Sequence, residues 1–185
     1  MRSRNRRTLI AALALLSVAL ATVACSGIGA FLTQVPLTGT SEPGPMPERT
    51  PARVVRVIDG DTIEVEIGGR EYRLRYIGID APETVRENTP VEWMGPEASA
   101  ANKALVNGKM VYLEKDVSET DRYGRLLRYV FLADGTFVNG ELVRLGYAQA
   151  ITYAPDVKYQ GLLRTLEREA RSAARGLWRP APDNP

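Results

Sequence analysis

Four acidic side chains stand at the ends of predicted strands in the stretch VIDGDTIEVEIGGREYRLRYIGIDAPET, which runs from Val57 to Thr84. Asp and Gly are ordinary turn formers, and an Asp-Gly-Asp sequence by itself favours that simple interpretation. Asp61 and Asp80, however, end separate strands of one predicted meander, so the fold can bring their carboxylates together. Two carboxylates held close repel each other unless a cation relieves the repulsion. The four acids are Asp59, Asp61, Asp80 and Glu83.

The chain of 185 residues contains no histidine and one cysteine. This composition excludes Ser-His and Cys-His catalysis, imidazole ligands to a metal and a disulfide within the folded part. A general base must then be Asp, Glu, Lys or Tyr. A metal must be a hard cation, and carboxylates, a backbone carbonyl and water are the ligands that suit Ca²⁺. Turn formation and Ca²⁺ binding are both open interpretations of the acids.

Two arginines offer a complementary chemistry. Arg75 lies on the predicted strand that leads to Asp80, and Arg125 lies in the polar loop DRYGR. Either residue could simply face solvent. A phosphodiester under attack gathers negative charge on its non-bridging oxygens, however, and a guanidinium group is a rigid, permanently charged fork of donors that fits this charge.

A framework of strands and helices must position these residues. Alternation of apolar and polar residues predicts strands, with tight turns at Asp59–Asp61 and Gly68–Gly69. Helical spacing predicts a helix from Pro96 to about Asn107, a short helix capped by Asn139, and a last helix between Asp156 as its cap and Gly176 as its end. We expect an α+β fold, a five-stranded OB-type β-barrel with three helices packed outside. The predicted strands cover residues 53–58, 62–67, 71–79, 110–115 and 126–132.

Composition divides the chain into three parts. Residues 1–24 have a basic start and an apolar stretch, which predicts a signal peptide. Cys25 follows directly in ATVACSG, a pattern similar to a bacterial lipobox, so cleavage before Cys25 and lipidation of its thiol are expected. Residues 25–51 are rich in Pro, Gly, Ser and Thr and predict a flexible linker, and residues 52–180 form the predicted domain. The protein is therefore expected to be exported, either lipid-anchored at the outer face of the cell membrane or freely secreted.

The net charge of +2 does not belong to the folded part, because residues 51–185 hold 19 basic and 20 acidic side chains. Any nucleic acid would bind through a local cluster rather than through the overall charge.

Five motifs in unbroken order resemble the staphylococcal nuclease, or thermonuclease, family: VIDGDT, RYIGIDAPET, GPEAS, DRYGRLL and RGLW. The resemblance covers about residues 52–178 and implies the OB barrel with added helices. It also implies that Asp61, Asp80 and the backbone carbonyl of Ala81 bind Ca²⁺, with Asp59 and Thr62 supporting them. Ala81 stands where the best-known member has Thr, a change that keeps the carbonyl and loses a hydroxyl.

The same resemblance implies the catalytic residues. Glu83 corresponds to the proposed general base, and Arg75 and Arg125 to the two catalytic arginines. Substrate contacts are expected from Arg122, which replaces a Lys, and from Tyr123. A further tyrosine contact falls on Ile151, Thr152 or Tyr153, depending on a gap of a single residue, and Tyr153 is the expected one.

The resulting expectation is a monomeric, Ca²⁺-dependent nuclease that hydrolyses DNA and RNA with little sequence selectivity and leaves 3′-phosphate ends. The alternative is a non-catalytic OB module that binds nucleic acid or a protein. The presence of both Asp, the Glu and both Arg argues against that alternative.

Overall fold

The computed structural model describes residues 48–84 and 92–180. The predicted signal peptide, Cys25 and most of the predicted linker lie outside these residues. No helix within them is long and apolar enough to cross a membrane. The elements are β1 (Thr50–Val57), β2 (Thr62–Ile67), β3 (Arg70–Tyr76), β4 (Ile79–Asp80), α1 (Gly95–Val106), β5 (Met110–Glu114), β6 (Leu126–Leu132), α2 (Val138–Arg144), β7 (Gln149–Ala150), α3 (Gln160–Ser172) and the 3₁₀ turn η1 (Gly176–Trp178).

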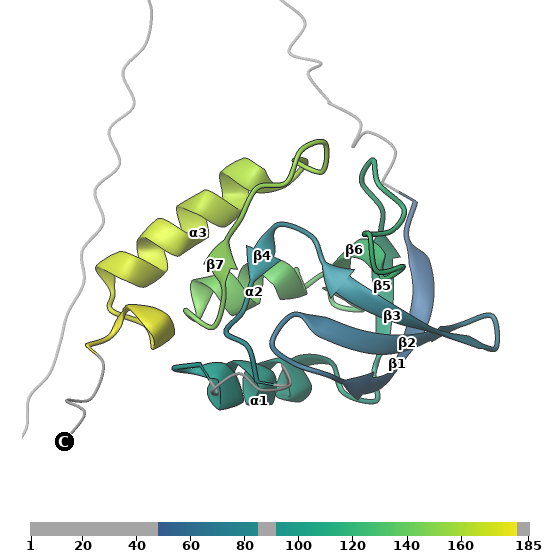
Figure 1. The fold of residues 1–185 in the computed structure, drawn as a ribbon, viewed down its shortest axis with the longest axis horizontal. Coiled ribbons are helices and arrows are strands. Elements are labelled where there is room, and N and C mark those ends of the chain that lie inside the picture. The colour runs from purple at the N-terminus through teal and green to yellow at the C-terminus, as the bar shows by residue number, and fades with distance from the viewer. Residues whose placement is uncertain (1–47, 85–91, 181–185) are drawn as a thin grey trace, which may run out of the picture. The chain divides into compact units, whose positions relative to one another are not determined.

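Five strands close into a barrel in the order β1-β2-β3-β6-β5. β1, β2 and β3 form an antiparallel meander, β3 pairs in parallel with β6, and β5 closes the barrel by pairing with both β6 and β1. The three helices lie outside the barrel (Figure 1). The predicted α+β architecture, a five-stranded barrel with three outer helices, is confirmed.

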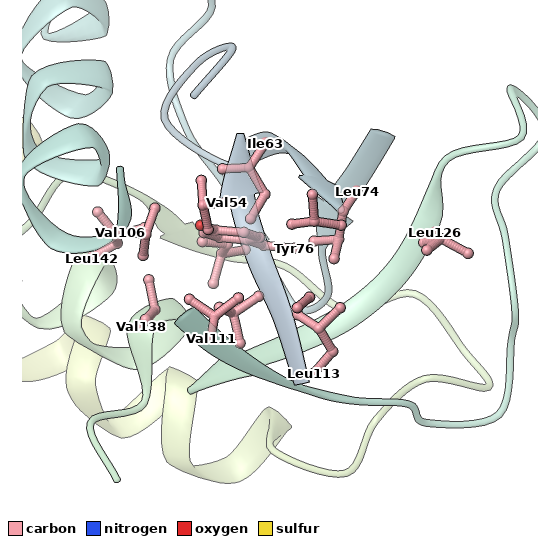
Figure 2. Close-up of a cluster of buried hydrophobic side chains, with 14 of the residues drawn as sticks. Val54, Ile63, Leu74, Tyr76, Val106, Val111, Leu113, Leu126, Val138 and Leu142 are labelled. Atoms are coloured by element: carbon pink, nitrogen blue, oxygen red, sulfur yellow. The ribbon is translucent and has the colours of Figure 1, made fainter. Parts of the chain in front are cut away.

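The barrel interior is filled by alternate residues of the strands, as the two-residue period of a pleated strand requires. Ile63 and Val65 of β2 and Leu74 of β3 are fully buried. Val106 of α1 and Leu142 of α2 join the same cluster, so the helices cover openings of the barrel (Figure 2). This core fixes the ends of β2 and β3, where the predicted site residues begin.

The predicted third strand, residues 71–79, is wrong in its extent, because β3 ends at Tyr76 and β4 is a separate strand that pairs with β7. Gly78 lies between them with φ +79°, and a Cβ there would come within 2.5 Å of Leu163 Cδ1. Only glycine combines this backbone angle with so close an approach. The chain therefore leaves the barrel at Gly78 and carries Asp80 to its rim.

The predicted turn at Asp59–Asp61 is present, but Gly60 is not required there for an unusual backbone angle. Gly60 has no left-handed backbone angle; instead, a Cβ on it would meet the Ala81 Cβ at 2.5 Å and the Ala98 Cβ at 3.0 Å. The missing side chain lets the turn lie directly against the residue that follows Asp80.

Both predicted side-chain caps are wrong. α2 has Phe137 at its N-cap, while Asn139 is buried one residue inside the helix. Its Nδ2 donates to the Ile77 carbonyl and its Oδ1 accepts from the Val130 amide, both at 2.9 Å. The Asn139 side chain therefore ties α2 to β6 and to the residue that follows β3, rather than to its own first turn.

The last helix also differs at both ends. α3 begins at Gln160, and Asp156 instead accepts hydrogen bonds from the amides of Val117 and Ser118 at 3.0 and 2.8 Å. The helix ends at Ser172, and Gly176 begins η1.

Replacing Asn139 by Ala should lower the free energy of unfolding by roughly 3 kcal/mol, because it leaves two buried backbone groups without partners. Urea denaturation measures this loss. Asn107→Ala is the matched control, since Asn107 is exposed after α1. Equal stability of the two variants would show that the buried amide is dispensable.

Candidate active site

The guanidinium group of Arg75 joins the carboxylates of Asp61 and Asp80. Arg75 forms an ion pair with Asp61 and another with Asp80, the latter with Nη2 to Oδ1 at 2.5 Å. Asp61 is buried, whereas the Asp80 side chain is 55% exposed. The two acids predicted to converge therefore lie together around one positive charge, with Asp61 buried and Asp80 exposed.

Three neighbours hold the Asp61 carboxylate and its backbone in place. Thr62 Oγ1 donates to Asp61 Oδ1 at 3.0 Å, and the Ala81 amide donates to Oδ2 at 2.7 Å. Asp59 Oδ1 accepts from the Asp61 amide at 2.9 Å. The positions of Asp59 and Thr62 fit the supporting role expected for them.

α1 fixes the same turn from outside the barrel. Asn102 is fully buried, and its Nδ2 donates to the Asp59 carbonyl at 2.9 Å. Its Oδ1 accepts from the Tyr76 hydroxyl at 2.9 Å. One amide thus links the turn that carries Asp61 to the end of the strand that carries Arg75.

A polar hollow of about 170 Å³ contains these groups. Glu83 and Arg125, predicted to be catalytic, also line it. So does Glu92, which sequence reasoning missed. Glu92 Oε2 accepts from the Glu83 amide, and the Glu92 amide donates to the Glu83 carbonyl, both at 3.1 Å. The full lining is Asp59, Asp61, Arg75, Asp80, Ala81, Glu83, Glu92 and Arg125.

Asp59 is the acid of the hollow whose pKa is raised above its ordinary value. Burial raises this pKa, and the nearby Arg75 and the hydrogen bonds of Thr62 offset the effect only in part. An extra positive charge in the hollow would favour the ionised carboxylate, because opposite charges close together stabilise each other.

The donors of the hollow fit a hard divalent cation. Asp61 and Asp80 already converge on one cationic group, and Ala81 lies in the same lining. Within residues 48–84 and 92–180, no three acidic, histidine or cysteine side chains are grouped closely enough to hold a metal by themselves. Carboxylate oxygens are the ligands that hard cations prefer.

A larger groove of about 540 Å³ adjoins the hollow, and Arg75 and Arg125 line both. The predicted substrate-binding residues Arg122, Tyr123 and Tyr153 all line the groove. Its apolar lining comes from Ile77, Gly78, Ile79 and Leu127. A lining that combines charged groups, apolar residues and exposed aromatic rings suits a nucleotide, whose phosphate is ionic and whose base can stack.

The loop after β5 presents three of the predicted residues together. The Tyr123 ring is 68% exposed, and the guanidinium carbons of Arg122 and Arg125 lie 4.8 and 5.5 Å from its centre. Arg122 Nη2 also donates to the Tyr123 hydroxyl at 2.7 Å. Two positive charges and a hydroxyl therefore face the same part of the groove.

Asp121 organises this loop, and sequence reasoning did not single it out. Its Oδ1 accepts from the amides of Tyr123 and Arg125 at 2.9 and 3.0 Å, and its Oδ2 accepts from Arg125 Nε at 2.6 Å. Burial alone would raise the pKa of Asp121, but these hydrogen bonds outweigh burial and lower it. The available signal was an Asp at the first position of a turn that has Gly at its fourth, since the Gly124 amide donates to the Asp121 carbonyl.

Among the three alternatives for the further tyrosine contact, only Tyr153 lines the groove. The Thr152 hydroxyl instead accepts from Gln160 Nε2 at 2.8 Å, and the Ile151 amide donates to the Gly78 carbonyl. Asp156, the misassigned cap, joins the Tyr153 loop to the segment after β5 through its bonds to Val117 and Ser118. It therefore holds the two walls of the groove together.

Comparison with known proteins agrees with this geometry. The sequence model described as "Staphylococcal nuclease homologue" matches residues 73–180. The thermonuclease of Staphylococcus hyicus is 44% identical over 126 residues, 68% of this chain and 74% of that protein. The thermonuclease of Staphylococcus intermedius is 43% identical with the same coverage. Endonuclease YncB of Bacillus subtilis is 42% identical over 66% of this chain and 59% of its own length.

The chain therefore belongs to the staphylococcal nuclease family. It is a nuclease, a hydrolase, and the family resemblance found in its motifs is confirmed.

Replacing Asp121 by Ala should lower kcat/KM by about 100-fold, because displacement of a catalytic group by about an ångström has an effect of this size. Nuclease assays measure the loss. Asp134→Ala is the matched control, since Asp134 Oδ1 accepts from the Thr136 amide in a similar turn outside the groove. If both variants lose activity equally, the Asp121 contacts do not position Arg125.

Proposed function

We propose that the protein is a Ca²⁺-dependent nuclease that hydrolyses the phosphodiester bonds of DNA and RNA and leaves 3′-phosphate ends. The observation that carries the proposal is the convergence of Asp61, Asp80, Glu83, Arg75 and Arg125 on one hollow beside a nucleotide-sized groove. The names of the relatives, thermonuclease and endonuclease, support the same reaction.

Glu83 acts as the general base. It lines the hollow with both arginines, and its backbone is held on both sides by Glu92. A carboxylate is a weak base for water, so it needs a nearby positive charge to favour the proton transfer. The proton moves from the attacking water to a Glu83 carboxylate oxygen as the water oxygen bonds to phosphorus.

Arg75 and Arg125 bind the phosphate. Both line the hollow and the groove, so a phosphate at the junction lies between their guanidinium groups. Their permanent charge stabilises the extra negative charge that the phosphate oxygens gain during attack. As the water oxygen bonds to phosphorus, the bond from phosphorus to the 5′ oxygen breaks. Arg125 donates a hydrogen bond to the departing 5′ oxygen, which takes its proton from solvent, and the phosphate remains on the 3′ side of the cut.

Asp61, Asp80 and the Ala81 carbonyl would hold Ca²⁺. When bound, Ca²⁺ supplies positive charge that favours deprotonation of water and offsets the charge of the phosphate. Arg75 contacts both carboxylates and lines both the hollow and the groove, so its guanidinium group is within reach of a phosphate bound where the two meet.

The groove favours nucleotides without reading their sequence. Tyr123 and Tyr153 are exposed rings on its walls, and Arg122 adds charge for a terminal phosphate. Stacking and phosphate contacts accept every base, so DNA and RNA are both substrates and sequence selectivity is low.

The chain acts outside the cell as a monomer. Residues 1–24 would serve as the signal peptide, and a lipid on Cys25 would tether the domain at the outer face of the membrane. The linker that follows supports this placement, since its composition suits a flexible spacer.

Glu83→Gln should lower kcat/KM by about 10²–10⁴, the usual contribution of a general base. Arg125→Ala should lower it by about 10²–10³, as removal of a donor to a developing charge does. Both variants should retain wild-type circular dichroism. Glu66→Gln and Arg70→Ala are matched controls on the outer barrel surface. Near-wild-type rates for Glu83→Gln and Arg125→Ala would remove these residues from the mechanism.

Clearing of DNA in an agar plate should occur with Ca²⁺ and stop with EGTA, because two carboxylates and a carbonyl cannot supply the missing charge themselves. The non-catalytic alternative, an OB module that only binds nucleic acid or a protein, predicts no clearing in either plate. Clearing that persists in EGTA would contradict the role of Ca²⁺ and leave the nuclease assignment intact.

A further inference from the structure

Arginines recur along one side of α3 at helical spacing. Arg164, Arg168 and Arg171 are exposed and are separated by four and three residues, which places them in one row. The buried residues of the helix, Leu163 and Ala170, face the core instead. We call these three residues the arginine row.

Two members of the row have no carboxylate partner among the described residues. Within the described part of the chain, Arg164 and Arg168 form no ion pair with a carboxylate. Arg164 Nη2 donates to Thr152 Oγ1 at 3.4 Å and Arg168 Nη2 to Thr165 Oγ1 at 2.9 Å, both uncharged partners. Arg171 pairs with Glu167 at 3.2 Å and lies 3.7 Å above the Trp178 ring. Like charges on one face repel, so this row gains from an anionic partner.

The row borders the nuclease site. β7 runs beside α3 (Figure 1), and the Ala150 amide donates to Glu167 Oε1 at 3.3 Å. β7 also pairs with β4, where Gln149 lies opposite Asp80. Arg164 contacts Thr152, the residue before Tyr153 on the groove wall. A strand of nucleic acid that leaves the groove past Tyr153 therefore meets Arg164 first.

The row is long enough to contact more than one phosphate. The helical rise places Arg164 and Arg171 about 10 Å apart along the axis, which exceeds the step between neighbouring phosphates of a strand, about 3.4 Å along the axis when the bases are stacked as in a duplex. We propose that the arginine row binds the phosphates of substrate nucleotides beyond the groove, so that the enzyme prefers long nucleic acid to dinucleotides. This inference rests on the proposed nuclease function of the site.

The test compares the wild-type chain with an Arg164→Gln, Arg168→Gln double variant on a dinucleotide substrate and on long single-stranded DNA. Gln has a helix propensity close to that of Arg, so the helix is retained. The KM for long DNA relative to that for the dinucleotide should rise about tenfold. The slope of log KM against log salt for long DNA should fall by about 1.4, since each phosphate contact on a single strand contributes about 0.7.

Arg53→Gln, Arg70→Gln is the matched control. Both residues are exposed arginines of the β1–β2–β3 meander and have no ion pair within the described residues. The β2–β3 hairpin lies on the far side of the barrel from α3 (Figure 1). This variant should keep the wild-type KM ratio and salt slope.

The proposal is overturned if the Arg164, Arg168 variant keeps the wild-type ratio and slope. It is also overturned if that variant loses only its binding to phosphatidylglycerol vesicles, because the row would then be a membrane contact. Fluorescence anisotropy of long DNA in EGTA gives the same comparison without catalysis. A wild-type chain that binds DNA through the row but cuts neither substrate would contradict the proposed function and support the row.

Discussion

The contact of one guanidinium group with two carboxylates organises the site. Arg75 joins Asp61, buried at the end of the barrel, to Asp80, exposed on its rim. Asp61 has lost nearly all contact with water, and a buried carboxylate needs a compensating charge or hydrogen bonds. It receives both, from Arg75 and from the Thr62 and Ala81 donors. These contacts keep Asp61 and Arg75 together at the end of the barrel.

Two glycines allow the backbone to bring Asp61 and Asp80 to these positions. Gly60 allows the Asp59–Asp61 turn to lie against Ala81, and Gly78 turns the chain out of the barrel towards Asp80. A side chain at Gly60 would collide with Ala81, and one at Gly78 would collide with Leu163, so either change would disturb the backbone that leads to Asp61 or to Asp80. The buried Asn102 then locks the turn to β3 from α1. Catalytic placement therefore depends on backbone packing as much as on the charged groups.

Strand alternation and turn glycines are local signals, and they predicted the barrel strands. The predicted residues that line the hollow were expected from the family motifs, and their roles stay predictions. Prediction from the sequence failed where a polar side chain could bond either to its own segment or to another part of the chain. Asn139 and Asp156 were predicted as caps because they stand near the starts of helices. Asn139 instead bonds to the Val130 amide and the Ile77 carbonyl, and Asp156 bonds to the amides of Val117 and Ser118. Asp121 and Glu92 were missed for the same reason, since their side chains hold loops in place through hydrogen bonds. Tertiary contacts decide such cases, and a single sequence does not display them.

We propose that the Asp61 and Asp80 pair holds Ca²⁺ in the working nuclease. Calorimetric titration of Ca²⁺ into the wild-type chain and into Asp80→Asn is the test of this pair. Asp80 is exposed and Asn has nearly its shape, so the variant should fold normally. We expect saturable Ca²⁺ binding in the wild type and none at comparable concentrations in Asp80→Asn. Equal binding by the two proteins would contradict the account.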